Sequence, residues 1–91
     1  MSEHEKVCQE LTSLYDAKNQ DYGNSFDDAI DEWGLVSAAI RIGDKQKRLN
    51  SILRSGIVKV KSESVRDTLL DLANYAIMTV MYMDRNKINA T

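Results

Sequence analysis

Apolar residues recur at helical spacing in the first part of the chain. Val7, Leu11, Leu14 and Tyr15 occupy positions i, i+4, i+7 and i+8, which lie on one face of an amphipathic helix. We therefore predict a helix over residues 2–18.

The next seven residues, Asn19-Gln20-Asp21-Tyr22-Gly23-Asn24-Ser25, form a cluster of turn formers in which glycine and asparagine can adopt positive φ. Ser25 is then placed to cap a short helix over residues 26–33. Its first turn carries Asp27 and Asp28, which interact favourably with the positive end of the helix dipole.

Gly34 interrupts this pattern, and a longer helix is predicted over residues 35–54. Its apolar face is formed by Leu35, Ala38, Ile42, Leu49 and Leu53. Gly56 closes the helix, because glycine readily takes the left-handed conformation that ends helices.

Residues 57–61 alternate apolar and basic side chains and are predicted to be a short extended segment, too short to build a sheet alone. Ser62 or Ser64 then caps the final helix, which is predicted to run to about Asn86.

This last helix is apolar on nearly every side over residues 76–83. A helix that is apolar all round is buried all round, and one chain of this size can cover only part of it. The remainder is predicted to pack against another subunit. The predicted fold is all-α: a small bundle of three long helices and one short helix in a single domain, residues 1–91, completed by oligomerisation into at least a dimer.

Composition narrows the possible functions. The chain contains no proline and has a formal net charge of −2, which favours helices and argues against binding of duplex nucleic acid through a strongly basic surface. No apolar run has the length of a signal sequence or membrane span. The single cysteine, Cys8, cannot form an internal disulfide and is predicted to be a small core residue, so we expect a cytoplasmic protein without a membrane partner.

Carboxylates recur along the last helix, where Glu63, Asp67, Asp71 and then Asn74 project within one stripe. Carboxylates so close repel one another unless a cation lies among them, and oxygen ligands of this kind suit Mg²⁺. The stripe therefore predicts a magnesium site with Asp67 and Asp71 as catalytic residues. The alternative is a solvated first half of the helix, with acids near its positive end.

A second set, Arg41, Asp44, Lys45 and Arg48, shares one face of the preceding long helix. The three basic residues can bind phosphate oxygens, while Asp44 can join the metal site. Salt bridging along the helix is the alternative, since Asp44 and Arg48 form an i, i+4 pair.

The segment from Lys18 to Phe26 combines a cation, hydrogen-bonding side chains, an aromatic ring and a glycine. A nucleotide needs donors for its phosphates and a stacking surface for its base. Lys18, Asn19, Asp21 and Tyr22 are therefore candidate ligand-binding residues, together with Arg41, Lys45, Arg48 and Asn74.

Three motifs carry a family resemblance across almost the whole chain. They read Lys18-Asn19-x-Asp21-Tyr22-Gly23-x-Ser25-Phe26, then Arg41-Ile42-x-Asp44-Lys45-x-x-Arg48-Leu49, then Glu63-Ser64-x-x-Asp67-Thr68-Leu69-Leu70-Asp71-Leu72-Ala73-Asn74-Tyr75-Ala76. Together they resemble the phage-associated family of nucleotide modification associated domains, first type. The resemblance implies phage or prophage origin, in the cytoplasm of a bacterial host, and the handling of nucleotides.

A looser resemblance extends to the MazG-like all-α nucleoside triphosphate pyrophosphohydrolases, because Asp71-Leu72-Ala73-Asn74-Tyr75 is similar to part of their last helix. Thr68 stands where that pattern has an acid, and the nearest acids are Asp67 and Glu63.

Two functions compete on these grounds. In the first, the protein is a Mg²⁺-dependent nucleotide pyrophosphohydrolase, whose metal activates water while basic residues stabilise the developing charge. In the second, it is a non-catalytic binder, for example a phage protein that sequesters a signalling nucleotide of host immunity. There the acids only orient the basic residues that grip the ligand.

Overall fold

The chain forms four helices, described by a computed structural model that covers residues 1–22, 24–55 and 61–88, without the side chains of 20–22 and 61–64. They are α1 (Glu3–Tyr22), α2 (Ser25–Trp33), α3 (Val36–Arg54) and α4 (Lys61–Arg85). The described residues contain no strand, which confirms the all-α prediction. None of the described helices is both long and apolar enough to cross a membrane.

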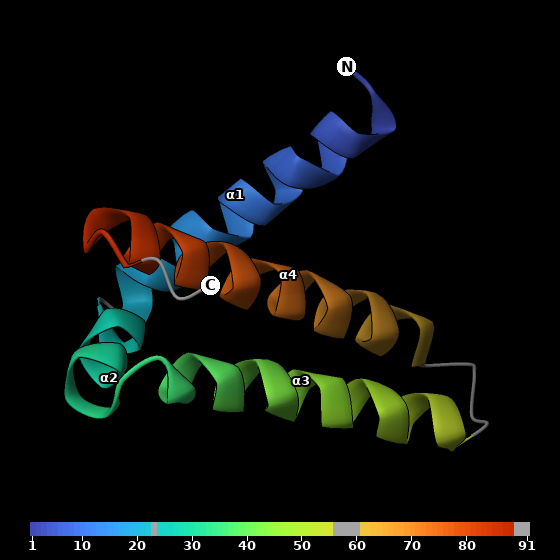
Figure 1. The fold of residues 1–91 in the computed structure, drawn as a ribbon. Coiled ribbons are helices and arrows are strands. Elements are labelled where there is room, and N and C mark those ends of the chain that lie inside the picture. The colour runs from blue at the N-terminus through green and yellow to red at the C-terminus, as the bar shows by residue number, and fades with distance from the viewer. Residues whose placement is uncertain (23, 56–60, 89–91) are drawn as a thin grey trace.

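Figure 1 shows α3 and α4 lying side by side as a helical hairpin, with α2 at one end of it. α1 crosses α4, and its N-terminal half projects beyond the hairpin. Among the described side chains of α1, only Leu11 is buried, and Cys8 is exposed. The prediction of Cys8 as a core residue was therefore wrong, because that part of α1 lies outside the packed region.

The buried core joins α2, α3 and α4. It consists of Phe26, Ile30, Ala38 and Tyr82, with Leu35, Tyr75 and Met78 packed against it. Two polar contacts fix α2 on α4: the Tyr82 hydroxyl donates a hydrogen bond of 2.5 Å to Asp31, and Arg85 forms an ion pair with Asp27. The bond to Asp31 raises the pKa of Tyr82, because ionisation would place two negative charges together.

The end of α1 and the start of α2 differ from the predicted boundaries. α1 continues to Tyr22 instead of ending at Lys18, so the predicted turn residues 19–22 are helical. No proline blocks the helix there, and turn propensity alone is weak enough for tertiary contacts to override. Ser25 is the first residue of α2 and not its cap; Asn24 holds the cap position without a side-chain cap bond.

Gly34 separates α2 from α3 as predicted, with φ of 84° and ψ of −179°. This region of backbone space is essentially restricted to glycine. The predicted extended segment and the closing Gly56 lie outside the described residues, except for Lys61, which begins α4. The predicted caps Ser62 and Ser64 fall within the helix, among the side chains that are not described.

Candidate functional site

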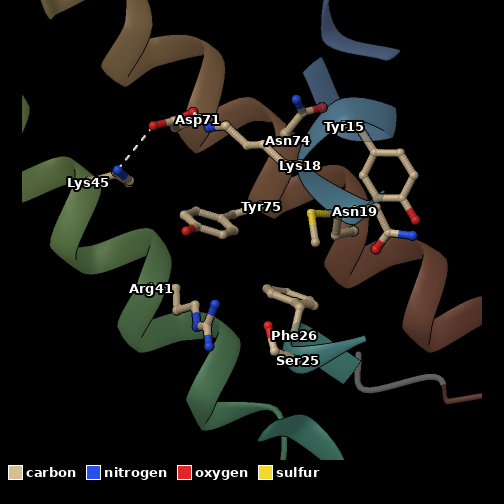
Figure 2. Close-up of a pocket in the computed structure, with 11 residues that line it drawn as sticks. Tyr15, Lys18, Asn19, Ser25, Phe26, Arg41, Lys45, Asp71, Asn74 and Tyr75 are labelled. Atoms are coloured by element: carbon tan, nitrogen blue, oxygen red, sulfur yellow. Dashed lines mark hydrogen bonds and ion pairs between the residues drawn. The ribbon is translucent and has the colours of Figure 1, made fainter. Parts of the chain in front are cut away.

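All four helices line one cavity of about 400 Å³, drawn in Figure 2. It opens between α1 and the α3–α4 hairpin, and α2 contributes to its floor. The lining residues are Tyr15, Lys18, Asn19, Ser25, Phe26, Arg41, Lys45, Asp71, Asn74, Tyr75 and Met78.

The continuation of α1 shapes one wall of the cavity. Tyr15, Lys18 and Asn19 stand at i, i+3 and i+4, which places them on one face of the helix. Had the helix ended at Lys18, Asn19 would have left this face. The predicted binding loop is thus partly the last turn of a helix.

Asp71 lies between two lysines that come from different helices. Its Oδ1 accepts a 2.6 Å hydrogen bond from Lys18 of α1, and its Oδ2 forms a 3.0 Å ion pair with Lys45 of α3. Partial burial raises the pKa of Asp71, but the hydrogen bonds and positive charges of the two lysines outweigh this, so the pKa lies below its ordinary value. The carboxylate is therefore ionised at neutral pH.

Aromatic rings form the floor of the cavity. Phe26 and Tyr75 are stacked, with ring centroids 5.8 Å apart and an interplanar angle of 11°. The guanidinium carbon of Arg41 lies 5.7 Å from the centroid of Phe26, within the range of a cation–π contact. A pair of aromatic rings, of which Phe26 is buried and Tyr75 partly buried, thus lies next to a cation (Figure 2).

Asn74, which lines the cavity, joins α4 to α1. Its side-chain amide donates a 3.0 Å hydrogen bond to the backbone carbonyl of Leu11. Leu11 itself is buried, and this bond and the Lys18–Asp71 pair hold α1 against α4 at two points.

The structure brings together six of the candidate residues predicted from sequence. Those that line the cavity are Lys18, Asn19, Arg41, Lys45, Asp71 and Asn74. Asp44, Arg48 and Asp67 are exposed and do not line it. The side chains of Asp21, Tyr22 and Glu63 are outside the described part of the chain, so predictions for them stay predictions.

A magnesium ion needs several oxygen ligands, such as carboxylates, grouped around one point. Among the described residues, no three His, Cys, Asp or Glu side chains are grouped so that they could hold a metal ion. Asp71, the acid in the cavity wall, has each carboxylate oxygen engaged by an ammonium group. The described residues alone do not form such a group, so the predicted magnesium site, which also includes Glu63, stays a prediction.

Sequence reasoning did not select the aromatic floor as part of the site. Phe26 and Tyr75 were seen within the family motifs, but no role was predicted for either. The available signal was spacing, because Tyr75 follows Asp71 by four residues and so shares its helical face. Tyr15, Ser25 and Met78 were missed because apolar or small residues at such positions ordinarily belong to the core or to a helix start.

Comparison with known protein families gives a match over most of the chain. The profile of the family described as nucleotide modification associated domain 1 matches residues 18–83. This range includes every lining residue of the cavity except Tyr15. Comparison with curated proteins and with solved structures gave no match.

Proposed function

The chain belongs to the nucleotide modification associated domain 1 family, and from this premise we propose that it binds a nucleotide in the cavity between its four helices. The observation that carries the proposal is the aromatic pair Phe26–Tyr75 with Arg41 beside it. A nucleotide offers a flat base for stacking and phosphate oxygens for a guanidinium, so one ligand satisfies both features.

The remaining lining residues supply further polar partners. Lys18 and Lys45 add positive charge on opposite walls, while Asn19 and Asn74 carry amide groups that can bind base or sugar. A cavity with an apolar floor and a few convergent polar groups is the usual form of a small-molecule site.

The charges favour binding over hydrolysis. A metal-dependent pyrophosphohydrolase needs several carboxylates that are short of basic partners, so that a divalent cation relieves their repulsion. Asp71 instead has two lysine partners, and Asp44 and Asp67 are exposed outside the cavity. This arrangement supports a binder whose acid orients its basic residues.

The proposal is tested by calorimetric titration with ribo- and deoxyribonucleotides, with and without Mg²⁺, followed by chromatography of the ligand recovered after denaturation. We expect saturable binding of at least one nucleotide, and recovery of that nucleotide intact. Release of pyrophosphate or phosphate would contradict the choice of binder over enzyme.

A pair of matched variants locates the binding site. Arg41→Gln removes the guanidinium beside Phe26 and is expected to weaken nucleotide binding by about 1–3 kcal/mol, the loss of a charge-assisted hydrogen bond. The control is Arg54→Gln, the same change on the same helix at an exposed position outside the cavity. Equal affinities of the two variants would place the site elsewhere.

We also propose that the chain associates with a second copy of itself through α4. Leu69, Ile77 and Val80 share one face of this helix and are 48%, 44% and 55% exposed in the single chain. Large apolar side chains gathered on one face of a helix favour burial against another protein surface.

A further inference from the structure

The charged side chains of the cavity wall are unequal in number. Lys18, Arg41 and Lys45 carry positive charge, and Asp71 carries the one negative charge among the described lining residues. The described part of the wall therefore has an excess of two positive charges at neutral pH. A ligand that matches the wall brings about two negative charges of its own.

The three cationic side chains of the wall differ in the contacts that they make within the protein. Both lysines already contact a carboxylate oxygen of Asp71, whereas Arg41 forms none of the ion pairs found among the described residues and lies over the Phe26 ring. Phosphate oxygens would therefore meet Arg41 without displacing an internal anion. To bind Lys45, the phosphate oxygens must compete with the carboxylate of Asp71, because both anions bind the same ammonium group.

The position of Arg41 also restricts where the ligand's charge lies. Its guanidinium carbon is 5.7 Å from the centre of the Phe26 ring, which is itself stacked with Tyr75. In a nucleoside monophosphate, one ribose separates the phosphate from the base. The outer phosphates of a triphosphate extend farther and would add negative charge that the described wall does not match.

We infer that the ligand of this cavity is a nucleoside monophosphate, with its base on the Phe26–Tyr75 floor, its phosphate on Arg41 and Lys45, and Asp71 acting as a competing internal anion. A phosphate monoester carries about −1.5 to −2 charges at pH 7, which matches the excess on the wall. This inference rests on the proposed nucleotide-binding function and specifies its ligand class.

The first test uses the wild-type protein. Calorimetric titrations without divalent metal compare adenosine, guanosine, cytidine, uridine and thymidine with their 5′-mono-, di- and triphosphates at constant ionic strength. For the base that binds best, we expect the monophosphate to bind at least about tenfold more tightly than the nucleoside and than the triphosphate.

The outcomes separate the two proposals. If a triphosphate binds more tightly than the monophosphate of the same base, the inference is overturned while nucleotide binding in this cavity stands. If no nucleoside phosphate binds at all, both are overturned.

The second test changes the charge of the wall. Asp71→Asn leaves an excess of three positive charges among the described lining residues and removes the competing anion, so the ratio of monophosphate affinity to nucleoside affinity should rise several-fold and the diphosphate should gain more than the monophosphate. This is the opposite of what loss of a ligand-binding or metal-binding aspartate would cause. A folded Asp71→Asn protein in which the ratio of monophosphate affinity to nucleoside affinity falls would overturn the role of Asp71.

Lys45→Gln gives the complementary result and does not depend on the folding of the Asp71 variant. It should weaken binding of the monophosphate by about tenfold or more while leaving nucleoside affinity nearly unchanged. Lys47→Gln is the matched control, because Lys47 is an exposed lysine of the same helix outside the cavity. Equal losses in the two variants would show a general charge effect and overturn the assignment of Lys45.

Discussion

Asp71 contacts lysines on two other helices, so its ionisation is coupled to how those helices are held together. In the folded protein its pKa lies below the value of about 3.9 that the unfolded chain shows. By linkage, the ionised carboxylate contributes stability that is fully present above the unfolded pKa and is lost as the pH falls through the folded pKa.

This coupling predicts a specific pH dependence. At pH 7 wild type should melt at a higher temperature than Asp71→Asn, which keeps the shape of the side chain and removes its charge. The difference should shrink as the pH falls below about 4, because protonated Asp71 resembles asparagine. Thermal unfolding from pH 3 to pH 7 measures it.

Asp16→Asn serves as the control, since Asp16 is exposed on α1 and takes no part in the ion pairs of the described residues. A gap between wild type and Asp71→Asn that stays constant over the whole pH range would contradict the prediction.

Replacing glycine by alanine should change the free energy of unfolding in opposite directions at Gly34 and at Gly43. Gly34 lies between α2 and α3 with φ of 84°, whereas Gly43 lies inside α3, and an added Cβ would meet no atom within 4 Å at either position. An added methyl group therefore has room at both positions, and the two positions differ in their backbone conformation.

Gly34→Ala should lower the free energy of unfolding by about 1–3 kcal/mol, the cost of a glycine-only conformation. Gly43→Ala should raise it by about 0.5–1 kcal/mol, because alanine loses less backbone entropy in a helix. Urea unfolding monitored by circular dichroism tests both. If the two changes have the same sign, contacts outweigh backbone conformation at one of these positions.

For the individual helices, the sequence predicts which segments are helical more accurately than the residues at which the helices begin and end. Gly34 is a reliable boundary because its effect is steric and local, whereas residues 19–22 are helical despite their turn propensity, directly after the ion pair of Lys18 with Asp71. The same distinction holds for the cavity. Charged residues on helical faces, such as Arg41 and Asp71, were visible as candidates, but the stacking of Phe26 on Tyr75 joins α2 to α4, and no local pattern encodes a contact between distant segments.

For the whole molecule, the small core and the exposed apolar face of α4 lead to a test of self-association. Val80→Asp should dissociate the proposed oligomer without unfolding the chain, since Val80 is 55% exposed and a charge there remains solvated in the monomer. Sedimentation or light scattering at micromolar concentration measures the change in mass.

Val36→Asp is the matched control, because Val36 is 59% exposed but lies at the start of α3. It should leave the mass unchanged. A wild-type protein that is monomeric at micromolar concentration would contradict self-association, and dissociation of both variants would contradict the choice of α4.

The attachment of α1 has a consequence for how affinity is to be understood. This helix is held on α4 largely by polar contacts near the surface, through Glu10–Arg66, Asn74–Leu11 and Lys18–Asp71, while its first turns project from the bundle. It also supplies one wall of the cavity. A molecule in which α1 has swung away has no complete site, so the measured dissociation constant equals the intrinsic constant divided by the fraction of molecules that are closed. A substitution far from the ligand, at Glu10 or Arg66, therefore changes affinity through that population alone.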